Sequence, residues 1–168
     1  RKHPWVFSGA IQKIVVDTTP PQPLTDGQLV NVFDENNNFL ATGHFQDGTI
    51  AVRIISFTQE PIDDDFWFKR LNNAFEMRKA MGLTENPATN IYRLVHAEGD
   101  QLPGLIIDFY NGTAVIQSHS AGMHFAKPQL VAALQKIYGK KLLAIYDKSA
   151  ETLGKQTDLK IENGYLYQ

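Results

Sequence analysis

The sequence predicts an α+β protein made of two small units joined by a helix. Short runs of β-branched and aromatic residues alternate with turn signals over residues 5–57, and helical spacing follows over residues 61–82. Strand patterns return after residue 91. Since 168 residues suffice for two domains of about 60 to 80 residues with modest cores, we predict two units.

The first unit, residues 1–57, is predicted to be a small β pseudo-barrel or sandwich of short strands. Residues 30–33 and 39–43 form a hairpin, because the intervening Asp and Asn residues tolerate left-handed backbone and cap turns. A second turn leads into the β-branched run 49–57. The proline-rich segment 18–23 lacks backbone donors and is predicted to be a surface loop.

A connecting segment, residues 58–90, contains the predicted helix over residues 61–82. Pro61 and three following aspartates favour the start of a helix, and Gly82 suits its end. One face carries residues at three- and four-residue spacing, namely Trp67, Leu71, Ala74, Phe75, Arg78 and Met81. The outward face carries three cations that we interpret as solvated, namely Lys69, Arg70 and Lys79.

The second unit, residues 91–168, is predicted to be a mixed strand, hairpin, helix and strand domain. Residues 91–96 form a strand, and residues 104–110 and 113–119 form a hairpin, because the intervening Asn111-Gly112 suits a tight primed turn. This unit therefore begins with three strands.

A helix over residues 126–138 follows, with Pro128 in its first turn and Gly139 at its end. Residues 142–146 are predicted to be a strand and residues 148–159 a polar loop. Asn163-Gly164 offers another hairpin turn, after which the chain stops. We therefore expect the second unit to be truncated.

Composition excludes several classes of function. Cysteine is absent, which removes disulfides, thiolate metal sites and a cysteine nucleophile. The net charge of −2 and the pI near 6.2 do not suit binding of nucleic acid through bulk charge alone. No apolar run is long enough for a membrane span and no signal peptide opens the chain, so we expect a cytoplasmic protein without a membrane partner.

Sequence motifs for catalysis are weak. No glycine-rich turn follows a strand and opens a helix, so we expect no bound cofactor. Glu98, Asp100 and Asp108 are close in sequence, but we interpret them as turn and surface residues rather than as an acid and base set. The five histidines lack the spacing of metal ligands, so we expect no metal.

Three stretches together resemble a known family: RLVHAEGDQLPGLIIDFY at residues 93–110, HPWVFSGAI at 3–11 and LATGHFQDGTIAVRIISF at 40–57. They resemble the cytosine carbon-five methyltransferases of large-subunit ribosomal RNA, which use S-adenosylmethionine (SAM). The resemblance implies a PUA domain, a central domain and a catalytic domain in that order, and it implies that this chain ends before the third. Residues 1–57 would then be a PUA-like domain, and residues 91–168 the central domain.

The resemblance implies that this chain is the RNA-recognition portion of such a methyltransferase. Ribosomal RNA is then the partner, and SAM is a cofactor of the parent protein that this portion does not bind. Without a cofactor loop or a cysteine nucleophile, the portion alone is expected to be inactive. A homodimer is an assembly that the family suggests, although no residue indicates the pairing surface.

RNA recognition requires cations for phosphates and aromatic rings for unpaired bases. We interpret Trp5 and Phe7 as core residues, because large aromatic residues in a small domain are usually buried. The candidate RNA-binding residues are Arg1, Lys2, His3, Arg53, Tyr92 and Arg93.

Two other functions remain open at this point. One is a stand-alone PUA-type RNA-binding adaptor, which a stop codon near Gln168 would favour over a reading frame that continues for about 200 residues, the length of one further domain, and carries a glycine-rich cofactor loop. The other is a protein-interaction scaffold with no RNA role, which the slightly acidic balance permits. Measuring RNA affinity at two salt concentrations would separate the scaffold from both RNA-binding alternatives.

Overall fold

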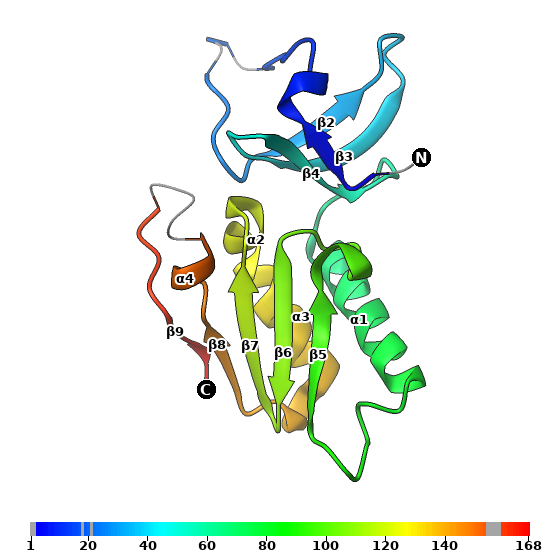
Figure 1. Ribbon diagram of the computed structural model, residues 1–168, viewed down its shortest axis with the longest axis vertical. Coiled ribbons are helices and arrows are strands. Elements are labelled where there is room, and N and C mark those ends of the chain that lie inside the picture. The colour runs from blue at the N-terminus through cyan, green and yellow to red at the C-terminus, as the bar shows by residue number, and fades with distance from the viewer. Residues whose placement is uncertain (1–2, 18, 21, 154–158) are drawn as a thin grey trace.

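The computed structural model of the protein describes residues 3–17, 19–20, 22–153 and 159–168. It confirms the α+β class, with a smaller all-β unit at one end of the molecule and a larger unit of sheet and helices at the other (Figure 1). The larger unit has two layers, because its helices α1 and α3 lie on one face of its sheet (Figure 1).

The first sheet has four antiparallel strands in the order β1-β4-β3-β2. The strands are β1 (Trp5–Phe7), β2 (Leu29–Phe33), β3 (Phe39–Phe45) and β4 (Ile50–Ser56), with the 3-10 turn η1 (Ser8–Ala10) after β1. In the predicted β2–β3 hairpin, the Asp34 carboxylate accepts bonds from the backbone N–H groups of Asn36 and Asn38 at 2.9 and 2.8 Å. The hairpin is confirmed, and this side chain explains the turn.

Helix α1 (Asp64–Ala80) confirms the predicted helix, although it is slightly shorter than the pattern indicated. Asp63 caps it, because its side chain accepts a bond from the backbone N–H of Phe66 at 3.0 Å. Its buried face includes Trp67 and Leu71, as the spacing predicted, and it also buries Arg78.

The interpretation of Arg70 as a solvated cation was wrong. Its guanidinium donates to the backbone carbonyl of Ile55 at 2.9 Å and bonds the side chain of Gln101. It also lies over the ring of Phe66, 5.0 Å from the centroid. A helical pattern does not show which neighbouring segments the long arginine stem can reach, so these contacts could not be predicted from it.

The second sheet has five strands in the order β5-β6-β7-β8-β9. They are β5 (Ile91–His96), β6 (Leu105–Tyr110), β7 (Thr113–Ser118), β8 (Ala144–Asp147) and β9 (Gly164–Tyr167). The predicted hairpin of β6 and β7 is confirmed, and Asn111 and Gly112 have φ angles of 44° and 94°, as a primed turn needs. Strand β8 runs parallel to β7, which requires a crossover between them.

Helices α2 (Ala121–Phe125) and α3 (Lys127–Tyr138) provide this crossover, followed by the 3-10 turn η3 (Gly139–Lys141). Alternate residues of β6 and β7 are buried, and they share one core cluster with residues of α1 and α3. The fully buried side chains of this core include Leu94, Leu105, Ile107, Ile116, Leu130, Leu134 and Ile145. The core therefore lies between the second sheet and its two long helices.

Three predictions about the second unit need correction. Two helices were not predicted: α2, and α4 (Ala150–Leu153), which lies inside the expected loop 148–159; residues 154–158 of that loop lie outside the described residues. Asn163-Gly164 is not a hairpin turn, because β9 pairs antiparallel with β8, so that Ile145 faces Tyr167. Both helices are about one turn long, and the β9 pairing is non-local, so a periodicity argument could not find them.

Candidate nucleic-acid interface

The two units meet along a seam formed by a row of residues across the first sheet. His44, Arg53 and Trp5 are directly paired across β3, β4 and β1, and paired residues share a face of a sheet. His44 is buried at one end of the row, with its ring stacked on that of Trp67 in α1 at 6.1 Å. Gly122 of α2 closes over this ring, since a methyl group there would lie 2.1 Å from the Cγ of His44. We use the name inter-unit seam for the contacts that this row makes with the second unit, from His44 at one end to Trp5 at the other.

Burial in the seam lowers the pKa of His44 to about 4. Its Nδ1 atom has no hydrogen-bond partner within the described part of the chain, so no acceptor there favours the charged form. Because the folded pKa lies below the unfolded value of about 6.5, the stability gained by burying the neutral ring is complete above pH 6.5 and is lost as the pH falls toward 4.

Acidification is therefore expected to weaken the fold through His44. Between pH 7 and pH 5 the wild-type chain should lose about 2 kcal/mol more unfolding free energy than the variant His44→Phe, which keeps a ring against Trp67 but cannot titrate. Urea unfolding of both proteins at the two pH values measures this difference. Equal losses in both proteins would show that His44 does not titrate in this way.

An aromatic row lies along the edge strand β1, at the outer end of the seam. His3, Trp5 and Phe7 alternate along the chain, with ring centroids 5.6 Å apart for His3 and Trp5 and 6.3 Å apart for Trp5 and Phe7. His3 is exposed, Trp5 is half-buried and Phe7 is 45% exposed. The interpretation of Trp5 and Phe7 as core residues was therefore wrong, because alternate aromatic residues give the same pattern on a core face and on an exposed face.

Arg53 lies beside the aromatic row. Its half-buried guanidinium donates to the side-chain oxygen of Gln46 at 3.3 Å and forms no ion pair among the described residues. Desolvation lowers its pKa, while the charges of Glu98 and Asp26 raise it. Most of its N–H donors are therefore available to a phosphate group.

Two residues of the second unit complete this surface. The indole N–H of Trp5 donates to the carboxylate of Glu98 at 2.9 Å, which fixes the ring. Burial lowers the pKa of His119. The charge of Glu98 raises this pKa and the charge of Arg53 lowers it, so both charges act on the imidazole of His119. The Nε2 atom of His119 is buried and has no hydrogen-bond partner in the described structure.

The other candidate residues from the sequence lie elsewhere or are already engaged. Arg93 forms a two-bond pair with Asp108 at 2.8 and 3.0 Å, which neutralises its charge. Tyr92 packs against the core of the second unit and is only 8% exposed. Arg1 and Lys2 lie outside the described residues. The structure thus brings His3 and Arg53 together but separates them from Tyr92.

The three acidic residues considered for catalysis do not converge. Glu98 accepts from Trp5, Asp100 pairs with Arg78, and Asp108 pairs with Arg93. The interpretation of Asp100 and Asp108 as simple turn and surface residues was incomplete, since both form ion pairs across elements. Within the described ranges, no cluster of His, Asp or Glu is arranged to hold a metal ion, and no helix is both long and apolar enough to cross a membrane.

Comparison with known proteins defines the class of the first unit. A sequence model of the PUA-like domain family matches residues 1–57, the segment that carries the first sheet. The chain is 36% identical over 168 residues to ribosomal RNA large subunit methyltransferase I of Erwinia tasmaniensis, and 36% identical over 169 residues to that of Tolumonas auensis. Each alignment covers 99% of this chain and 40% of the relative.

Solved structures agree on the fold. A putative SAM-dependent methyltransferase from Streptococcus mutans matches with a TM-score of 0.70 and 21% identity, over 89% of this chain and 36% of that one. A putative methyltransferase solved with SAH matches with a TM-score of 0.71.

The chain is thus a PUA-like domain joined to an α+β unit. Over nearly its whole length it is similar to ribosomal RNA large subunit methyltransferases, in line with the sequence resemblance. It spans about two fifths of the length of the curated relatives that it matches.

Proposed function

We propose that this chain is the RNA-recognition portion of a SAM-dependent ribosomal RNA methyltransferase. The observation that carries the proposal is the alignment of 99% of the chain with ribosomal RNA large subunit methyltransferases, which includes the PUA-like match over residues 1–57. By the family resemblance, the parent protein would methylate carbon five of a cytosine in the cytoplasm. The homodimer that the family suggests stays part of this proposal.

The division of labour follows from the residues that the chain contains. Attack on carbon five of cytosine uses a cysteine thiolate in the resembled family, and none of the 168 residues is cysteine. We therefore propose that residues 1–57 and 91–168 bind and present RNA, and that SAM binds and methyl transfer takes place on a separate domain. Helix α1, within residues 58–90, contributes Trp67 and Leu71 to the second core, so it would move with the second unit.

The proposed RNA surface is the aromatic row of His3, Trp5 and Phe7 with Arg53 beside it. Stacking of unpaired bases on aromatic rings is tolerant of sequence, and a neighbouring guanidinium can hold the phosphate between two bases. The chain has a net charge of −2, so attraction of RNA by overall charge is not expected. In this arrangement one local cation, Arg53, and the neighbouring aromatic rings would bind RNA instead.

Salt dependence tests whether Arg53 holds a phosphate. Affinity for a single-stranded ribosomal RNA fragment is measured by fluorescence anisotropy at several salt concentrations for the wild-type chain and for Arg53→Gln. We expect weaker binding and a log-log salt slope reduced by about 0.7 to 1, since one phosphate contact is lost.

Lys69→Gln provides a matched control, because Lys69 is an exposed cation on α1 outside the proposed surface. It should leave both the affinity and the slope unchanged. An identical slope for Arg53→Gln and the wild type would remove Arg53 from the interface, and an absence of any salt-dependent RNA binding would favour the protein-interaction scaffold.

A further inference from the structure

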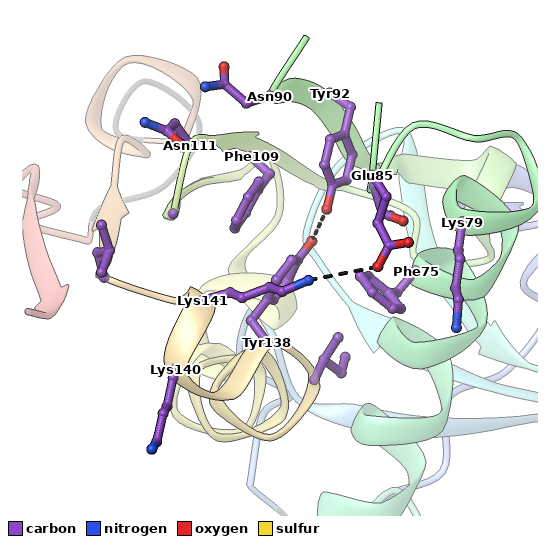
Figure 2. Close-up of a pocket in the computed structure, with 14 residues that line it drawn as sticks. Phe75, Lys79, Glu85, Asn90, Tyr92, Phe109, Asn111, Tyr138, Lys140 and Lys141 are labelled. Carbon is purple, nitrogen blue, oxygen red and sulfur yellow. Dashed lines mark hydrogen bonds and ion pairs between the residues drawn. The ribbon is translucent and has the colours of Figure 1, made fainter. Parts of the chain in front are cut away.

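A cleft of about 460 Å³ opens at the end of the second unit that lies away from the first sheet. The β6–β7 turn, η3 and the segment before β5 surround it, and Figure 1 places that turn at the end of the molecule opposite β1. Figure 2 shows the side chains that line it. Aromatic rings and lysine side chains make up much of this lining.

The cleft contains a hydrogen-bond donor that has no acceptor. The hydroxyl groups of Tyr92 and Tyr138 lie 2.8 Å apart and point toward one another (Figure 2). Burial raises the pKa of both tyrosines, so both keep their protons. One proton joins the two oxygens, and the other has no acceptor among the described residues. A buried donor of this kind favours a ligand or water that supplies an oxygen.

The mouth of the cleft carries an excess of positive charge. Lys79, Lys140 and Lys141 line it, against one carboxylate, Glu85. Lys141 and Glu85 approach at 3.8 Å and are both 75% exposed, so this ion pair is weak and can open. Lys140 forms no ion pair in the described part of the chain. An anion would therefore be attracted to this end of the molecule.

One wall of the cleft is aromatic. Phe109 stacks on Tyr138 with centroids 4.4 Å apart and planes 6° apart, and Phe75 meets Tyr138 edge-on at 5.3 Å. A volume of about 460 Å³ suits a ligand the size of a single nucleotide. The aromatic wall suits the base of a nucleotide. The free hydroxyl donor suits an oxygen of the sugar or the base, and the lysines at the mouth suit the phosphate.

We propose that this cleft binds one nucleotide, with its base against the aromatic wall and its phosphate at Lys140 and Lys141. The nucleotide is either a free nucleoside monophosphate or an unpaired nucleotide of RNA. The site does not depend on the aromatic row of β1, because it lies at the opposite end of the molecule, so either proposal can fail alone.

NMR titration of the labelled chain tests the proposal and locates the site. The ligands are uridine and adenosine monophosphates, the corresponding nucleosides, inorganic phosphate and a short single-stranded RNA. We expect saturable shifts centred on Asn111, Gly112 and Lys141. Shifts from the monophosphates identify a free nucleotide as a ligand, whereas shifts at the same residues from RNA alone identify an RNA nucleotide.

Variants test the two halves of the site. Lys140→Gln/Lys141→Gln should weaken nucleotide binding by about tenfold, since two exposed charges are lost. Lys69→Gln/Lys160→Gln removes the same charge from exposed positions outside the cleft and should leave binding unchanged. Tyr138→Phe keeps the stacked ring but removes the hydroxyl group, and it should weaken binding while the wild-type spectrum of the core is retained.

Three results would overturn the proposal. The first is no saturable shift around the cleft with any nucleotide or RNA. The second is equal affinity for inorganic phosphate and for the monophosphates, because the base would then contribute nothing. The third is unchanged affinity in both the lysine variant and Tyr138→Phe.

Discussion

Replacing Arg78 by methionine should lower the free energy of unfolding by about 3–5 kcal/mol. Arg78 extends from α1 and pairs with Asp100 after β5, and the two side chains are only 10% and 2% exposed. Its guanidinium donates twice to this carboxylate and once to the backbone carbonyl of Arg93 at 3.0 Å. Methionine fills a similar volume but leaves a buried carboxylate unpaired, which accounts for the large effect.

Urea unfolding at neutral pH measures this loss, and Lys79→Met is the matched control. Lys79 is the next residue on α1, and its side chain is 56% exposed, so its replacement should change stability by less than about 0.5 kcal/mol. The double variant Arg78→Met/Asp100→Leu should recover part of the loss, because no buried charge remains. A loss below about 1 kcal/mol in Arg78→Met would mean that water reaches Asp100 and replaces the pair.

Arg78 also illustrates how much the sequence could predict. Its position on the buried stripe of α1 followed from helical spacing, and the structure confirms that it is buried. Its partner could not be predicted, because Asp100 is 22 residues away in a short 3-10 turn, η2 (Ala97–Asp100), where sequence indicated only a turn. Periodicity reports which face of an element is buried but not which element covers it.

The same distinction applies to the two candidate sites. The β2–β3 and β6–β7 hairpins were predictable because their turns carry local signals, Asp34 in one and Asn111-Gly112 in the other. The alternation of His3, Trp5 and Phe7 is visible in the sequence. Their exposure depends on β1 being an edge strand, and the order of strands in the sheet cannot be seen in the sequence. The nucleotide cleft depends on Tyr92 meeting Tyr138, 46 residues apart, which no local pattern shows.

Removal of the aromatic row should have the largest effect on RNA binding. Each base stacked on an aromatic side chain contributes about 1–3 kcal/mol, so Trp5→Ala/Phe7→Ala should weaken binding of single-stranded RNA by about thirtyfold or more. Phe33→Ala is the matched control, because Phe33 is 50% exposed on β2, at the opposite edge of the same sheet. Anisotropy titration of all three proteins with one RNA fragment measures the difference, and the control should bind as the wild type does.

A second variant separates stacking from the contact between units. Trp5 also donates to Glu98, so its removal could act by loosening the seam rather than by removing a platform for a base. Trp5→Phe keeps an aromatic face and loses only the N–H donor, so it should retain most of the affinity if stacking is the cause. If Trp5→Phe binds as weakly as Trp5→Ala/Phe7→Ala, the bond to Glu98 carries the effect through the seam. If even the double alanine variant binds as tightly as the wild type, RNA is bound at another surface.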